Sequence, residues 1–191
     1  NIVIEGIERI SLIDIENANS MGYRIKLLGV SQPDGDILYQ SMQPCLVPKT
    51  SPLAQLEGGT NMLIIDGDFI GQTSYSGPGA GQGPTASAIV SDIIDIARNN
   101  IGPVFGVLAT KLVRKSGSHE ATSSRYYIRF SLIDKPGVLA KVSGILGDHE
   151  ISVDRMRQAH HLGSEAPLLI VTHKSKRNNL NKALMEIEKL D

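Results

Sequence analysis

The sequence has one cysteine, almost no net charge and no long apolar run, and each of these shortages argues against a class of protein. Cys45 cannot form a disulfide within the chain, so we expect a reducing, cytoplasmic setting and interpret the thiol as a small buried hydrophobe. The formal charge of -1, without a basic stripe, argues against binding to nucleic acid. No apolar run reaches the ~18 residues that a membrane-spanning helix needs, so no membrane association is expected.

Patterns for metal binding and for serine hydrolysis are missing too. The five histidines show neither H-x-x-x-H nor H-E-x-x-H spacing, and a single cysteine cannot complete a zinc site, so no metal site is expected. No G-x-S-x-G elbow is present. The acidic pairs Asp34/Asp36 and Asp66/Asp68 each flank a glycine, which is typical of turns rather than of catalytic carboxylates.

What is present is typical of a globular protein of one or two domains. Apolar residues make up 41% and charged residues 20% of the 191 residues, close to the average of globular folds. The charges are unevenly distributed: residues 1–100 hold five Lys/Arg and eleven Asp/Glu, whereas residues 101–191 hold fourteen and nine. This asymmetry indicates two units with different surfaces.

The first hundred residues carry alternating strand and helix signals. Residues 1–10 predict a short strand and a turn. Ser11 then opens a helix that stops before Gly22, because its hydroxyl can cap the free amides of the first turn and glycine favours a helix end. Residues 23–47 and residues 61–75 each predict a β-hairpin, since each pair of apolar runs is joined by a glycine-containing turn.

A glycine-rich run over residues 77–84 leads into a helix predicted over residues 85–99. Ile89, Ile93 and Ile96 mark one face of that helix, and neighbouring aliphatic residues widen it. So broad an apolar face predicts burial against a sheet. The first unit is therefore predicted to be α+β, with an antiparallel or mixed sheet and helices on one face.

The last part of the chain predicts a β-α-β-β-α order. Apolar and polar residues alternate over residues 127–132, as in a half-buried strand, and one-sided helices are predicted over residues 138–146 and 180–190. Two further strands lie between the helices, at residues 151–157 and 168–172. One more strand would complete a ferredoxin-like unit. Before this unit, residues 101–124 are expected to form a connector.

Two loops that precede helices are candidate binding sites. The glycine-rich run lets backbone amides approach a ligand, and a helix N-terminus favours anions, although the spacing matches neither Walker A nor the dinucleotide fingerprint. The segment Asp134-Lys-Pro-Gly-Val-Leu-Ala places Gly137 and free helix amides where a carboxylate can bind. The alternatives are a structural turn at the first loop and, at the second, a proline that merely begins a helix.

These segments resemble a known family. Ser124-Arg-Tyr-Tyr-Ile-Arg-Phe-Ser-Leu-Ile-Asp-Lys-Pro-Gly-Val-Leu-Ala-Lys-Val is similar to the start of an ACT domain, the amino-acid-sensing module of many biosynthetic enzymes. Upstream, four segments resemble the catalytic domain of homoserine dehydrogenases in order and spacing: Glu5-Gly-Ile, Gly22-Tyr-Arg-Ile-Lys-Leu-Leu, Leu46-Val-Pro-Lys and Gly77-Pro-Gly-Ala-Gly-Gln-Gly-Pro-Thr-Ala-Ser-Ala.

The resemblance implies an NAD(P)-dependent oxidoreductase that interconverts L-homoserine and L-aspartate 4-semialdehyde, in threonine and methionine biosynthesis. It implies that Gly81, with its neighbours Gly79 and Ala80, lies beside the nicotinamide cofactor. It also implies a homo-oligomer that associates through the ACT and catalytic-domain sheets. An amino-acid effector, L-threonine, is expected at an interface between two ACT domains, on a turn made by Asp134, Pro136, Gly137, Val138 and Leu139.

The chain departs from the family at both ends. The nucleotide-binding segment, the catalytic lysine and the substrate-holding acids of the family lie upstream of Glu5-Gly-Ile, so no catalytic residue is assigned; neither Lys26 nor Lys49 stands in the matching context. We therefore expect a C-terminal fragment that neither binds NAD(P) tightly nor transfers a hydride alone.

Three parts are expected in this fragment. Residues 1–100 would be the end of the catalytic domain, residues 101–124 a connector, and residues 125–191 an ACT domain whose last strand is missing. The alternative is a stand-alone ACT-type module for amino-acid binding or dimerisation.

Overall fold

The computed structural model describes residues 2–100, 102–103, 105–115, 117, 123–133, 135–158 and 165–190. The chain divides into two compact units, and the first β-hairpin contributes to both. One unit comprises Asn1–Glu5, Gly29–Gln43 and Lys115–Asp191, and the other comprises Gly6–Leu28 and Pro44–Arg114.

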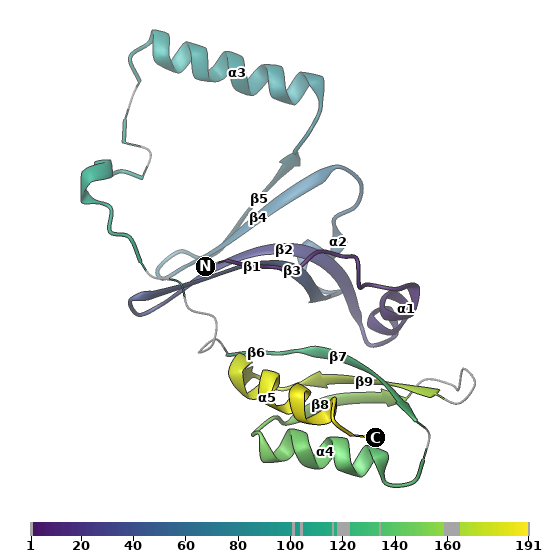
Figure 1. Ribbon diagram of the computed structural model, residues 1–191. Coiled ribbons are helices and arrows are strands. Elements are labelled where there is room, and N and C mark those ends of the chain that lie inside the picture. The colour runs from purple at the N-terminus through teal and green to yellow at the C-terminus, as the bar shows by residue number, and fades with distance from the viewer. Residues whose placement is uncertain are drawn as a thin grey trace. The chain divides into compact units, whose positions relative to one another are not determined.

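The first half of the chain contains two small sheets and three helices (Figure 1). Its elements in chain order are β1 (Val3–Ile4), α1 (Leu12–Ser20), β2 (Tyr23–Asp34), β3 (Ile37–Pro48), α2 (Pro52–Gln55), β4 (Thr60–Gly67), β5 (Gly71–Pro78) and α3 (Gln82–Ala97). The strand order β1-β3-β2, with β1 parallel to β3, makes the first sheet mixed. Strands β4 and β5 form a separate antiparallel hairpin. Both predicted hairpins are confirmed.

Helix α1 begins at the residue that the sequence indicated. The carboxylate of Asp14 accepts hydrogen bonds from the backbone N–H of Ser11 at 2.8 Å and from its hydroxyl at 2.6 Å. Asp14 is buried, so this reciprocal contact places its charge at the positive end of the helix dipole. The chain leaves the helix through Gly22, which has a positive φ of 85°.

The second half confirms the predicted β-α-β-β-α order. After the short 3-10 turn η1 (Ala109–Lys111), its elements are β6 (Ser123–Ser124), β7 (Tyr127–Ile133), α4 (Val138–Asp148), β8 (Val153–Gln158), β9 (Glu165–Thr172), β10 (Ser175–Lys176) and α5 (Arg177–Ile187). Strand β9 lies between β7 and β8 and is antiparallel to both. Strands β6 and β10, which were not predicted, pair beside this sheet over two residues each.

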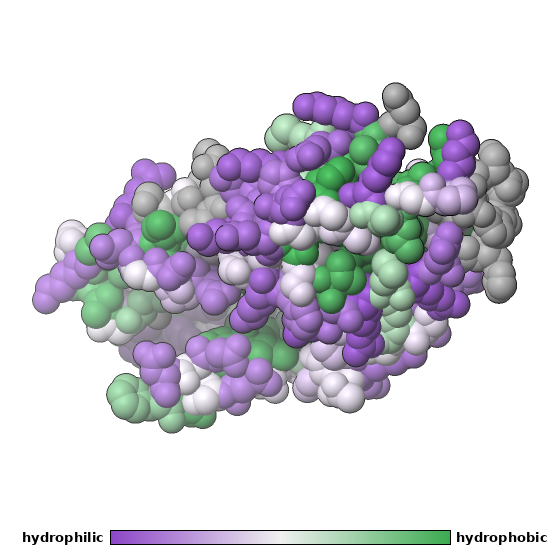
Figure 2. Space-filling model, turned by 90° about the horizontal axis from the view of Figure 1, so that it is seen from below, coloured by the Kyte–Doolittle hydropathy of each residue, from purple (hydrophilic) through white to green (hydrophobic). Residues whose placement is uncertain are grey.

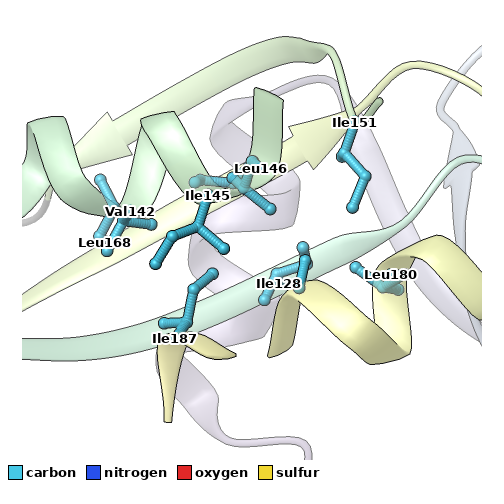
Figure 3. Packing of buried hydrophobic residues seen from close by; sticks show 10 residues of the cluster. Ile128, Val142, Ile145, Leu146, Ile151, Leu168, Leu180 and Ile187 are labelled. Carbon is cyan, nitrogen blue, oxygen red and sulfur yellow. The ribbon is translucent and has the colours of Figure 1, made fainter. Parts of the chain in front are cut away.

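One apolar layer joins this sheet to its two helices (Figure 3). The strands contribute Ile128, Leu168 and Ile170, and the helices contribute Val142, Ile145, Leu146, Leu180, Ala183 and Ile187. The other face of β9 is buried as well, because Leu169 is 0% and Val171 is 3% exposed. A central strand buried on both faces explains why β9 is a nearly continuous apolar run.

No helix within the described residues is long and apolar enough to cross a membrane. The predicted α+β class is confirmed, with the mixed sheet β1-β3-β2 in the first half and the antiparallel sheet β7-β9-β8 in the second.

Leu146→Ala is expected to destabilise the second half by about 2–5 kcal/mol, because a fully buried side chain would leave a cavity in the apolar layer. The matched control is Leu139→Ala on the same helix, where the side chain is 37% exposed and the loss should be well under half as large. Urea denaturation followed by circular dichroism measures both changes. Equal losses for the two variants would contradict the assignment of Leu146 to the core.

Candidate functional site

The glycine-rich loop connects β5 to α3. Gly79 and Ala80 form a bend after Pro78, and Gly81 immediately precedes the helix with a φ of 132° and a ψ of 151°. The N–H of Thr85 donates to the carbonyl of Gly81 at 3.1 Å, which closes the first helical turn. The helix begins three residues earlier than predicted, because Pro84 fits in a first turn that needs no N–H donor at that position.

The backbone of this loop has two positions that favour glycine. A Cβ on Gly79 would overlap the side-chain amide of Asn61, which lies at the start of β4. Gly81 has a φ that L side chains rarely adopt. These two glycines therefore have structural reasons of their own, and a cofactor contact at Gly79, Ala80 and Gly81 stays a prediction.

The apolar face of α3 is not buried, which corrects the prediction that it packs against a sheet. No residue of the helix is buried, and Ile89, Ile93 and Ile96 are 55%, 58% and 67% exposed. The preceding hairpin has only two strands, and no described helix or strand covers this face. Other apolar side chains are exposed too, and one face of the molecule carries separate hydrophobic patches among hydrophilic residues (Figure 2). A face as apolar as that of α3 is typical of a surface that contacts a partner.

The second predicted site is the turn between β7 and α4. Lys135 N–H donates to Ile133 O at 2.9 Å, and Val138 N–H donates to Lys135 O at 3.3 Å. Gly137 caps the helix in the left-handed region, with a φ of 89°. Asp134 lies outside the described residues. Gly137 therefore begins α4 in a conformation that L side chains avoid. The N–H groups that follow Val138 in the first turn have no acceptor within the helix.

A small pocket of about 40 Å³ lies at this turn. Of the predicted effector residues, Val138 and Leu139 line it, whereas Pro136 and Gly137 shape the turn beside it. Sequence reasoning missed five lining residues, namely Leu132, Ile133, Lys135, Gln158 and Leu168. Strand pairing brings the last two together, because β8 places Gln158 opposite Leu168 of β9.

Burial changes the pKa of two side chains, Cys45 and Tyr126. Burial raises the pKa of the Cys45 thiol, so this half-buried side chain stays protonated at neutral pH and is a poor nucleophile. Burial also raises the pKa of Tyr126, against the opposing effect of Arg177, whose guanidinium lies 5.5 Å from the ring centre. The described residues contain no cluster of three or more His, Cys, Asp or Glu placed to hold a metal ion.

Gly137→Ala is expected to destabilise the chain by roughly 1 kcal/mol, because alanine is strained at a φ of 89° even though a Cβ would meet no other atom. Gly144→Ala is the matched control, since Gly144 lies inside α4 with open space around it and alanine favours a helix. Urea denaturation should show opposite signs for the two changes. A stabilising Gly137→Ala would show that the turn is not held in the left-handed conformation.

Comparisons with known proteins match two separate parts of the chain to two families. The homoserine dehydrogenase family domain matches residues 1–94, and the ACT domain matches residues 126–191. Homoserine dehydrogenase of Helicobacter pylori is 36% identical over 190 residues, which are 99% of this chain and 45% of that protein. The enzyme of Neisseria gonorrhoeae is 33% identical over 196 residues, with 98% and 45% covered.

Solved structures agree with these relatives. The homoserine dehydrogenase of Thiobacillus denitrificans superposes with a TM-score of 0.89 at 34% identity, over 100% of this chain and 44% of that one. A homoserine dehydrogenase of S. aureus gives 0.65 at 26% identity, over 93% and 43%. The chain thus spans less than half the length of the relatives it matches. Because the match is continuous in order and includes both domains, the chain belongs to the homoserine dehydrogenase family.

Proposed function

We propose that this chain works as the C-terminal part of an NAD(P)-dependent homoserine dehydrogenase in the cytoplasm. Residues 1–100 would form the last part of the catalytic domain and residues 125–191 the ACT regulatory domain. Residues 101–124 would connect the two. The observation that carries the proposal is similarity over 99% of the chain to the Helicobacter pylori enzyme. The family match over residues 1–94 favours this function over a stand-alone ACT module.

The proposed contribution to the reaction is a backbone surface for the cofactor. When bound, NAD(P)H supplies the hydride that reduces L-aspartate 4-semialdehyde to L-homoserine. Gly79, Ala80 and Gly81 would lie against the nicotinamide end, since a loop without bulky side chains admits a flat ring. The free amides of α3 favour negative charge nearby. The groups that bind the substrate and move its proton would come from outside this chain.

A chimera tests the proposed activity. The chain should not oxidise NAD(P)H with L-aspartate 4-semialdehyde by itself. Fused behind the part of the Helicobacter pylori enzyme that it does not match, it should restore turnover, because the two pieces then cover the full length of that enzyme. Gly81→Val in the chimera should lower kcat/KM by at least about tenfold, because a β-branched residue is strained at a φ of 132°. Gly83→Val, whose Cβ would meet open space, is the control.

An inactive, well-folded chimera, or equal activity of the Gly81 and Gly83 variants, would argue against the loop's proposed contact with the cofactor.

The ACT turn is proposed as one half of an L-threonine site. Its pocket of about 40 Å³ holds only a few water molecules, which is too little for an amino acid. A second ACT domain in a homo-oligomer would therefore supply the other wall of the site. The helix amides after Gly137 can receive the effector's carboxylate. Gln158 is the one neutral polar side chain among the lining residues, and it can hydrogen-bond a hydroxyl that the surrounding aliphatic side chains cannot.

Titration calorimetry tests this site with L-threonine and with L-valine, which has nearly the same shape but no hydroxyl. Threonine should bind roughly fivefold more tightly than valine, because one neutral hydrogen bond contributes about 1 kcal/mol. Gln158→Leu should remove this preference for threonine. Gln72→Leu, on β5, is the matched control and should leave the preference intact. L-Isoleucine and L-methionine complete the panel. Tighter binding of valine than of threonine to the unchanged chain would contradict the proposed effector.

A further inference from the structure

A second, larger pocket lies in the first half of the chain, among β2, α2 and the start of β4. Its volume is about 350 Å³, within the range of small-molecule sites. Neither the glycine loop nor the ACT turn lines it. Leu28, Leu53 and Leu56 give it an aliphatic wall, and the polar residues that matter here are Lys26, Glu57 and Asn61.

Lys26 lines this pocket, and a hydrogen bond restrains its ammonium group. Its Nζ donates to the carbonyl of Leu56 at 2.6 Å, which ties β2 to the segment after α2 and restrains the side chain. An ammonium has three donors, so this bond leaves two of them for a ligand. Lys26 is half-buried, and a partly desolvated charge attracts a carboxylate more strongly than an exposed one does.

Glu57 supplies the opposite charge one residue beyond Leu56. Arg24 restrains the Glu57 side chain, because the guanidinium Nη1 donates to Ala54 O and to Glu57 Oε1, both at 3.1 Å. The other carboxylate oxygen of Glu57 has room for a further donor, because Glu57 is exposed and followed by Gly58, whose Cβ position is open. The pocket therefore combines a cation, an anion and an aliphatic wall.

We propose that this pocket binds a free α-amino acid with an aliphatic side chain. The carboxylate of the ligand binds the Lys26 ammonium, its α-ammonium binds Glu57, and its side chain lies against Leu28 and Leu53. Glu57 keeps its ion pair with Arg24, but both side chains are exposed, so its negative charge still repels a simple carboxylate, whereas a zwitterion also places an ammonium against the Glu57 carboxylate. The site is separate from the effector turn and does not depend on the proposed activity.

Asn61 connects the pocket to the glycine loop. Asn61 is one of the lining residues, and its side-chain amide occupies the space that a Cβ on Gly79 would fill. A ligand that contacts Asn61 therefore changes the surroundings of Gly79. The backbone amide of Gly79 becomes a second reporter of binding, outside the pocket itself.

Amide-resolved NMR titration of the whole chain with L-norvaline tests the proposal. We expect saturable shifts at Leu28, Leu56, Asn61 and Gly79. Butyrate and butylamine, each of which has only one of the two charges, should bind at least about tenfold more weakly. Absence of saturable shifts at these amides, or equally tight binding of butyrate, would overturn the proposal. Shifts at Val138 and Leu139 report the effector turn separately, so either site can fail alone.

Charge variants locate the contacts. Lys26→Met and Glu57→Gln should each weaken L-norvaline binding by about tenfold, whereas Lys49→Met, outside the pocket, should not. Lys26→Arg keeps a cation that can reach Leu56 O and should retain most of the affinity, which guards against a loss caused only by unfolding of Lys26→Met. Unchanged binding in Glu57→Gln would refute the zwitterion contact.

Discussion

The second half of the chain depends on one apolar layer between the sheet β7-β9-β8 and the helices α4 and α5. Strand β9 is the centre of that layer, because consecutive residues from Leu168 to Val171 are buried on alternate faces. Helix α4 must direct Val142, Ile145 and Leu146 onto the sheet. That orientation fixes where the helix begins, at the left-handed turn of Gly137, and a pocket opens there between β7, α4 and β9.

The first half has no comparable layer. Among its described residues the buried apolar ones are Ala18, Val47 and Ala54, all of them small or medium-sized, whereas the isoleucines of α3 and two aliphatic residues of β4, Leu63 and Ile65, are exposed. Polar backbone interactions hold much of it, among them the bonds of Lys26 and Arg24 to carbonyl groups near α2. The apolar face of α3, left uncovered after the glycine-rich loop, is typical of a surface that packs against a partner.

Local sequence signals predicted most of the elements and little of the sites. Alternation and turn glycines are properties of neighbouring residues, so the hairpins and the β-α-β-β-α order could be predicted. The apolar period of α3 showed that a partner surface is needed, but it carries no information on whether that surface lies in the same chain. Lys135 was within the predicted turn segment, yet Gln158 and Leu168 reach the pocket only through pairing of β8 with β9, which no local pattern records.

Gly81 and Gly137 show the same backbone arrangement at the start of two helices. Each precedes an apolar helix and has a positive φ, and the N-terminus of a helix favours an anionic group. What differs is the wall around them. The loop at Gly81 leads into α3, a helix with no buried residue. The turn at Gly137 adjoins aliphatic residues and one amide side chain, which suits a small amino acid. In the two proposed sites, specificity would come from the neighbouring elements, because a helix N-terminus attracts either anion.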